Sequence, residues 1–260
     1  MDNNKLDNNK KLDNKTLVIY IFHVLNNNVE YFLNNAIFKD DSVDFLIVCN
    51  SLSIKLSLPD SIKDYVKVLQ RENIGYDFGG WSDGLLTNDL YKEYDSFIFV
   101  NSSVKGPFVP SYYKERWTTI YLNGLSDTVK LFGSTINCCL SIYGPKPIDP
   151  VSESHVQSYI FSMKRDTLDY LIEEGIFTKK RYITNFIELI IQREFKMSRL
   201  IIEKGWNIGC LMNLYKDIDF TFKTQNREIS YLSDIMFPAY YNKLWTLHEL
   251  VFIKNNRMKL

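Results

Sequence analysis

TLVIYIF at Thr16–Phe22 is an unbroken run of β-branched, aliphatic and aromatic residues. Such a run is typical of a strand that is covered on both faces. In residues 27–38 the apolar side chains recur at helical intervals, and residues 44–49 (DFLIVC) return to a strand pattern. The order of strand, helix and strand predicts a βαβ unit with parallel strands.

The same alternation continues along the chain. Short strands are expected at residues 66–70, 96–100 and 130–133, with a helix at 81–94. Beyond His155 the pattern predicts helices at 156–174 and 183–204. The fold class is therefore α/β: a mostly parallel central sheet flanked by helices, with a helical C-terminal part. Ligands of such sheets bind where loops leave the carboxyl ends of the strands.

Residues 16–260 are expected to form a single domain. The preceding residues 1–15 contain the repetitive stretch KLDNNKKLDNK, which offers little apolar surface to bury. Disorder is expected for this tail. Within the domain no repeat of 20 to 50 residues is visible, so no internal boundary is predicted.

The balance of charge argues against a nucleic-acid partner, since Lys and Arg together number 31 and so do Asp and Glu. No apolar run reaches the length of about 18 residues that a membrane span requires. No signal peptide is expected, because no apolar segment follows a basic region near the start of the given sequence. The four cysteines lack the CxxC spacing of zinc sites. We expect a soluble, cytoplasmic protein.

RENIGYDFGGW at residues 71–81 concentrates polar side chains and glycines directly after an expected strand. Arg71 can pair with phosphate, Asp77 can accept hydrogen bonds from hydroxyls, and glycine lets the backbone approach a ligand. The candidate ligand-binding residues here are Arg71, Asn73, Gly75, Asp77, Gly79, Gly80 and Trp81. The spacing is neither GxGxxG nor a Walker loop. The alternative is a tight turn that caps a helix.

A second motif, YDSFIFVNSSVKGP at residues 94–107, follows the first. This pair of motifs resembles the donor-site motifs of bacterial and giant-virus glycosyltransferases related to rhamnan-synthesis proteins. The later stretches HVQSYIF (155–161), REFKMSRLIIEKGW (193–206) and LHELVFIKNNR (247–257) are also similar to that family. The resemblance covers roughly residues 16–257. It implies a GT-A-like fold and a nucleoside-diphosphate sugar as donor.

GT-A enzymes carry a DxD motif whose carboxylates hold the ribose and a Mg²⁺ or Mn²⁺ ion on the diphosphate. The resemblance places Asn101, Ser102 and Ser103 at these positions. Neutral oxygens attract a hard divalent ion less than carboxylates do. Asn101 and Ser103 are therefore candidates for a weak metal site or for direct hydrogen bonds to the donor.

The resemblance also suggests a general base. REFKMSRL can be aligned with the common glycosyltransferase pattern Glu-Asp-x-x-Leu-Ser-x-Arg, which places Glu194 at the acidic pair. Glu194 would then remove the proton from the acceptor hydroxyl in an inverting transfer. The alternatives are that Glu194 faces solvent or that Glu188 takes this role.

Five further residues are weaker candidates. His155 and Gln157 could contact the sugar or the leaving phosphate, and Lys254 and Arg257 could neutralise the departing diphosphate. Each has a plain alternative, as a surface residue or part of a solvated tail. His23 follows the first strand and is either at the cleft or a capping residue of the core.

The sequence thus predicts a hexosyltransferase-like glycosyltransferase of glycan or polysaccharide biosynthesis, with a saccharide or glycoprotein as acceptor. The alternative is a non-catalytic relative that binds nucleotide sugars or carbohydrates, because the DxD carboxylates are replaced. A phosphate-handling hydrolase lacks a nucleophile motif.

Overall fold

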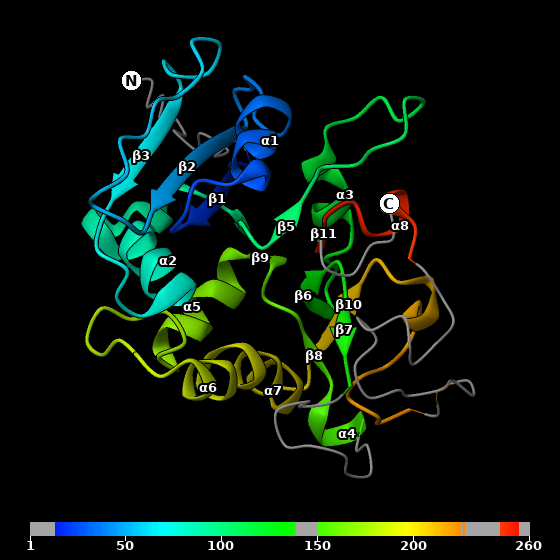
Figure 1. Ribbon diagram of the computed structural model, residues 1–260. Helices are drawn as coiled ribbons and strands as arrows, with labels where there is room; N and C mark the ends of the chain where they lie inside the picture. The colour runs from blue at the N-terminus through cyan, green and yellow to red at the C-terminus, as the bar shows by residue number, and fades with distance from the viewer. Residues whose placement is uncertain (1–13, 139–149, 225, 227–244, 255–260) are drawn as a thin grey trace, which may run out of the picture.

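The computed structural model describes residues 14–138, 150–224, 226 and 245–254 (Figure 1). Most of the tail for which disorder is expected, and Arg257, lie outside these residues. Lys15 lies inside them, and its carbonyl oxygen accepts a hydrogen bond of 3.2 Å from the backbone of Ser96. Within the described residues, no helix combines the length and the apolar character that crossing a membrane would need.

A seven-stranded sheet with the order β10-β6-β9-β4-β1-β2-β3 forms the centre of the fold. Parallel pairs join β1 to β2 and β4, β2 to β3, and β6 to β10, whereas β9 runs antiparallel to both of its neighbours. The mostly parallel α/β sheet is therefore confirmed. Its strands are β1 (Thr16–Phe22), β2 (Val43–Cys49), β3 (Val66–Gln70), β4 (Ser96–Asn101), β6 (Val129–Gly133), β9 (Ile160–Lys164) and β10 (Asn207–Cys210).

Helices cover both faces of this sheet (Figure 1). Helix α2 (Tyr76–Leu86) packs on β1 and β2 on one face, and α5 (Arg165–Glu173) packs on β9. On the other face α1 (Asn27–Asn35) brings Phe32 onto Tyr20 of β1, and α3 (Trp117–Asn123) lies beside it. A longer helical segment follows α5 and consists of α6 (Phe186–Leu189), a π-helical turn η3 (Ile190–Phe195) and α7 (Lys196–Glu203).

The remaining elements are short. Two small ladders pair β5 (Val104–Lys105) with β11 (Ile253–Lys254), and β7 (Ile136–Asn137) with β8 (His155–Val156). The short helices are η1 (Thr87–Glu93), α4 (Pro150–Glu153), η4 (Asn213–Tyr215) and α8 (Leu247–Leu250). The β5–β11 ladder carries Lys254 to the end of the sheet at which β4 finishes.

The expected helix at 156–174 is wrong in its first half. Residues 155–156 belong to β8, and residues 160–164 form β9 between β4 and β6. All of β9 except Lys164 is buried. A short apolar run that is covered on both faces cannot be told from a buried helix by its periodicity. The helix begins only at Arg165.

The helix expected at 81–94 begins earlier, at Tyr76, so Gly79 and Gly80 lie inside α2 and not in a loop. A Cβ atom on Gly79 would lie 2.2 Å from the carbonyl oxygen of Ile74, and one on Gly80 would lie 2.2 Å from Cδ1 of Ile21. These two glycines therefore allow α2 to approach the sheet and the preceding turn closely.

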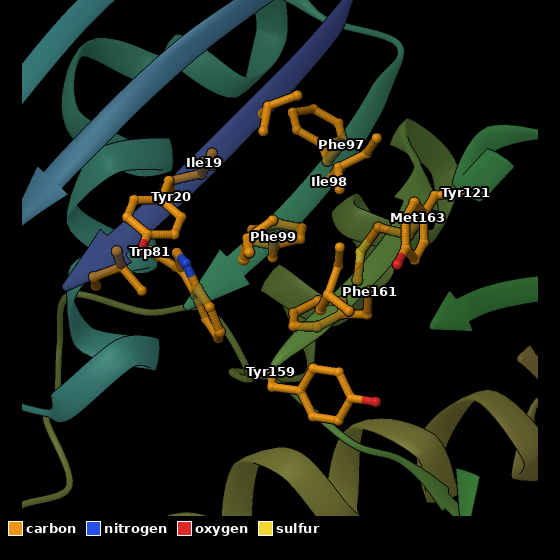
Figure 2. Close-up of a cluster of buried hydrophobic side chains, with 14 of the residues drawn as sticks. Ile19, Tyr20, Trp81, Phe97, Ile98, Phe99, Tyr121, Tyr159, Phe161 and Met163 are labelled. Atoms are coloured by element: carbon orange, nitrogen blue, oxygen red, sulfur yellow. The ribbon is translucent and has the colours of Figure 1, made fainter. Parts of the chain in front are cut away.

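Trp81 lies within the core under α2 (Figure 2). Its side chain is fully buried, and its ring packs edge-on against Phe99 of β4 and Phe161 of β9, at centroid distances of 5.5 and 5.4 Å. Phe78 of α2 adds a third edge contact at 5.2 Å. The structure thus assigns Trp81, which the motif placed at the donor site, to the packing of α2 on the sheet.

Candidate functional site

A cavity of about 270 Å³ opens at the carboxyl ends of β1, β3 and β4. We call it the strand-end cavity. One wall, the strand wall, consists of residues that follow these strands. The opposite wall, the helical wall, consists of residues from α6 and η3. The cavity brings together seven residues predicted from the sequence: His23, Asn73, Asp77, Asn101, Ser103, Glu194 and Lys254.

Asp77, Asn101 and Ser103 form one hydrogen-bonded group on the strand wall. The Asn101 side-chain Nδ2 donates to Oδ2 of Asp77 at 2.9 Å. Its Oδ1 accepts from the Ser103 backbone N–H at 3.0 Å and from the Ser103 hydroxyl at 2.6 Å. The two motifs of the sequence therefore meet through a direct contact between Asp77 and Asn101.

Burial raises the pKa of the Asp77 carboxyl from 3.8 to about 6. The hydrogen bond from Asn101 opposes this rise, while the negative charge of Glu194 across the cavity adds to it and Lys254 offsets it. Two carboxyl groups thus face one cavity, with a single lysine among its described lining residues. Such a site favours a ligand whose hydroxyl groups donate hydrogen bonds to the carboxyl groups and that carries its own counter-charge.

Glu194 lies on the π-helical turn η3 of the helical wall. Its Oε2 accepts a hydrogen bond of 2.8 Å from the Ser158 backbone N–H and a shorter one from the Ser158 hydroxyl. The Glu194 side chain is 19% exposed, so it is held in place and still reachable from the cavity. Single π-helical turns of this kind occur frequently at functional sites.

His155 lies behind Glu194 and does not line the cavity. Its Nδ1 is 2.7 Å from the carbonyl oxygen of Glu153, and its Nε2 is 3.9 Å from Oε1 of Glu194. The imidazole is almost completely buried. His155 therefore lies next to Glu194, beyond hydrogen-bond distance, and has no access to a ligand in the cavity.

Two other residues predicted at the donor site, Arg71 and Gly75, have structural roles in the turn before α2. Arg71 donates to Asp83 at 2.6 Å, to Asn50 at 2.9 Å and to the carbonyl oxygen of Ile74 at 2.8 Å. Its side chain is 10% exposed, so it braces the turn that carries Asn73 and is not open to phosphate. Gly75 supplies the left-handed N-cap of α2, with φ of 77°.

Ser102 and Gln157 lie beside the cavity lining. The carbonyl oxygen of Ser102 accepts a bond of 2.9 Å from Nδ2 of Asn28 in α1. The Gln157 side chain accepts a bond of 2.9 Å from the hydroxyl of Thr135. Both contacts fix the backbone next to the site.

Glu188, the alternative general base, lies at the surface. Its Oε1 is 3.5 Å from a guanidinium nitrogen of Arg181.

Several lining residues were not predicted from the sequence. They are Tyr76, Phe78, Ser158, Tyr159, Phe186, Leu189 and Ile190. Most are apolar or aromatic, and in a sequence such residues are indistinguishable from core residues. Tyr76 carries a local signal only in its backbone, because its φ of 52° is left-handed.

The side-chain oxygens of Asn101 and Ser103 are not arranged to bind a divalent metal ion without further ligands from a substrate. Oδ1 of Asn101 already accepts two hydrogen bonds from Ser103, so the two predicted metal ligands face each other. Among the residues described, no three His, Cys, Asp or Glu side chains cluster as a metal site would need. Mg²⁺ and Mn²⁺ prefer charged oxygen ligands, and Asp77 is the one carboxylate of this group.

A larger cavity of about 630 Å³ lies along β6 and β10. We call it the β10 cavity. Its Asp219 carboxylate accepts hydrogen bonds from Thr221 and Thr224, which lower its pKa and hold the surrounding loop. Because this carboxylate is engaged and the predicted motif residues are elsewhere, the strand-end cavity is the better candidate site.

Replacing Asp77 with Asn is expected to stabilise the free protein at pH 8. The folded state holds the Asp77 proton up to about pH 6, whereas the unfolded chain releases it near 3.8. Ionised Asp77 therefore reduces stability as the pH rises through this window, and the reduction persists above it. An amide carries no charge and can still accept the hydrogen bond from Asn101.

Because the Asp77 side chain is partly exposed, we expect D77N to raise the free energy of unfolding at pH 8 by about 2 kcal/mol, less than the full rise in the Asp77 pKa implies. Thermal unfolding at pH 8 and pH 4 measures it, and most of the gain should be lost at pH 4, close to the unfolded pKa of 3.8. The exposed Asp64 offers a matched control, D64N, which should change little at either pH. A destabilised D77N protein at pH 8 would contradict the assignment of a strained carboxylate.

Comparisons with known proteins add a family to this geometry. A family model described as rhamnan synthesis protein F matches residues 45–239. The virulence protein VirA of Vibrio anguillarum is 27% identical over 147 residues, which are 55% of this chain and 40% of VirA. The chain thus spans less than half the length of the curated relatives it matches.

Two solved structures are also similar. A197 from STIV is 11% identical with a TM-score of 0.34, over 67% of this chain and 76% of that chain. A putative nucleotide-diphospho-sugar transferase from Desulfovibrio desulfuricans G20 is 10% identical with a TM-score of 0.40, over 81% and 91%. At scores this low neither defines the fold. The family model, in contrast, matches about three quarters of the 260 residues, and the chain belongs to the family of rhamnan synthesis protein F.

Proposed function

We propose that this protein is a glycosyltransferase of the GT-A type that uses the strand-end cavity. It moves a hexosyl group from a nucleoside-diphosphate sugar to a hydroxyl group of a saccharide or glycoprotein. The observation that carries the proposal is the pair of carboxyl groups on opposite walls, Asp77 beside Asn101 and Glu194 beside Ser158. Membership of the rhamnan synthesis family supports a polysaccharide as the product.

In this proposal the strand wall binds the donor. Asp77 accepts hydrogen bonds from hydroxyl groups of the nucleotide sugar. The Ser103 hydroxyl donates to Asn101 in the free protein and lines the same cavity, and it turns toward the diphosphate when the nucleotide sugar binds. Lys254 lies at the same cavity and offers a positive charge to the departing diphosphate. Hydrogen-bond donors and cations placed where negative charge develops on the diphosphate lower the free-energy barrier to sugar transfer.

The helical wall binds the acceptor. Glu194 takes the proton from the acceptor hydroxyl while that oxygen attacks the anomeric carbon. The bond between the anomeric carbon and the diphosphate oxygen breaks on the opposite side, and the bonding electrons leave with the diphosphate. The anomeric configuration is inverted. His155 lies behind Glu194, with its Nε2 3.9 Å from Oε1 of Glu194.

The test is a panel of nucleoside-diphosphate sugars built on uridine, guanosine and deoxythymidine, each incubated with the protein and a mixture of saccharides. Release of the nucleoside diphosphate with formation of a glycoside is the expected result. A chelator arm decides metal dependence, since loss of transfer that Mg²⁺ or Mn²⁺ restores would show that an ion takes part. Unchanged transfer would remove the ion from the proposal.

The second candidate is a non-catalytic relative that binds nucleotide sugars or carbohydrates. It is favoured by the neutral side chains of Asn101, Ser102 and Ser103, where a metal-dependent enzyme would carry carboxylates. Binding of a nucleotide sugar without hydrolysis or transfer under any metal would support this candidate and contradict the enzyme.

A further inference from the structure

An aromatic pair connects the helical wall of the strand-end cavity to the start of α2. Phe186, the first residue of α6, lines the cavity although its side chain is 58% exposed. Its ring packs edge-on against Tyr76 at a centroid distance of 5.8 Å and an interplanar angle of 64°. A large apolar side chain this exposed inside a site that also holds two carboxyl groups indicates a surface that a ligand covers.

Tyr76 is held in its position from several sides. Its hydroxyl donates to the carbonyl oxygen of Thr184 at 3.0 Å, and its own carbonyl oxygen accepts from Nδ2 of Asn50 at 3.0 Å. Its backbone is left-handed, with φ of 52°, directly after the left-handed Gly75. A residue other than glycine adopts this conformation at a cost, and such strain gathers at functional sites. The aromatic pair is thus a preformed surface.

The chemistry of this surface suits a sugar ring. Exposed aromatic faces pack against the C–H groups on the apolar face of a sugar, and the sugar hydroxyls remain free for polar partners. Leu189 and Ile190 continue the apolar lining along the same wall toward Glu194. The helical wall therefore offers an apolar track that ends at a carboxylate.

Position decides which sugar lies there. A general base works within hydrogen-bond reach of the hydroxyl it deprotonates, so the attacking sugar lies at Glu194. Phe186 begins α6, and Glu194 lies about two helical turns further along the same segment, on η3. Each turn advances by about 5 Å, so the two positions are on the order of 10 Å apart along the wall. That distance exceeds one sugar ring, so a sugar on Phe186 is a neighbour of the attacking one in the same chain.

We propose that Phe186 and Tyr76 form an acceptor subsite that stacks an inner sugar of a growing glycan, so that the acceptor is an oligosaccharide of at least two sugars. The proposal rests on the proposed transferase function. Under it the donor lies on the strand wall, and Phe186, held by its contact with Tyr76, contributes to acceptor recognition.

The experiment uses the panel of uridine, guanosine and deoxythymidine diphosphate sugars as donors. It compares sugar transfer to methyl rhamnosides of one, two and three sugars, and it measures hydrolysis of the donor without acceptor in parallel. For the wild type we expect the KM to fall about tenfold from one sugar to two, the size of one good aromatic contact. F186A should lose this gain, so that its KM no longer differs between an acceptor of one sugar and an acceptor of two. F186W should restore it.

Ile187 provides the matched control, because it is 53% exposed, adjacent to Phe186 and not part of the cavity lining. I187A should behave as the wild type with every acceptor. A KM that does not depend on acceptor length, or an F186A protein that keeps the full gain, would overturn the subsite while leaving the transferase intact. A wild type that consumes no donor would instead overturn the transferase function on which the subsite rests.

Discussion

Replacing Glu194 with Gln is expected to lower kcat for transfer by about 10²–10⁴-fold, the usual contribution of a general base. The amide keeps the shape of the side chain and can still accept the hydrogen bonds from Ser158, but it cannot take a proton. Donor affinity should stay within about twofold of the wild type, because the donor contacts lie on the strand wall. Single-turnover kinetics together with donor titration measures both quantities.

Glu188 gives a matched control on the same helical segment. Its carboxylate is exposed and lies 3.5 Å from Arg181 at the surface, so E188Q should keep full activity. If E188Q were inactive and E194Q active, Glu188 would be the base. An E194Q protein that loses donor affinity and kcat together would contradict the separation of the two walls.

The replacement W81A is expected to reduce the free energy of unfolding by about 3–5 kcal/mol, as is usual when a large aromatic side chain is removed from a core. Trp81 is fully buried and contacts Phe99 of β4 and Phe161 of β9 (Figure 2), and it also contacts Phe78 of its own helix. The cavity left behind would separate α2 from the sheet. Urea unfolding followed by circular dichroism measures the loss.

The milder W81F keeps an aromatic ring and should lose less stability than W81A. Tyr112 is 79% exposed, so Y112A should change the free energy of unfolding by less than about 0.5 kcal/mol. Should W81A instead unfold like the wild type and bind donor poorly, Trp81 would be a ligand contact, as the motif first indicated.

The parallel strands could be predicted because each is an apolar run between turn residues. β1 and β3 have the expected bounds, and β2, β4 and β6 agree within one residue at each end. β9 could not be predicted in the same way. It lies between β4 and β6 in the sheet, although β6 precedes it in sequence, and its pattern IFSMK suits a buried helix equally well.

The polar lining of the strand-end cavity was predictable in part, where a residue type carries chemistry. Asp77, Asn101 and Glu194 drew attention as polar residues in recognisable motifs, and the strand-end cavity contains all three. The ion pair of Arg71 with Asp83, which keeps Arg71 from the expected phosphate contact, could not be predicted. The two residues meet only when α2 folds back on the turn. Phe186 was missed for a similar reason: an aromatic residue at a helix start is usually a core contact.

Soaking crystals of the protein with uridine, guanosine and deoxythymidine diphosphates tests the central claim most directly. We predict that at least one of them binds in the strand-end cavity, with its ribose at Asp77 and its diphosphate toward Ser103 and Lys254. Occupation of the β10 cavity alone, or the absence of all three nucleotides from the strand-end cavity at saturating concentration, would contradict it.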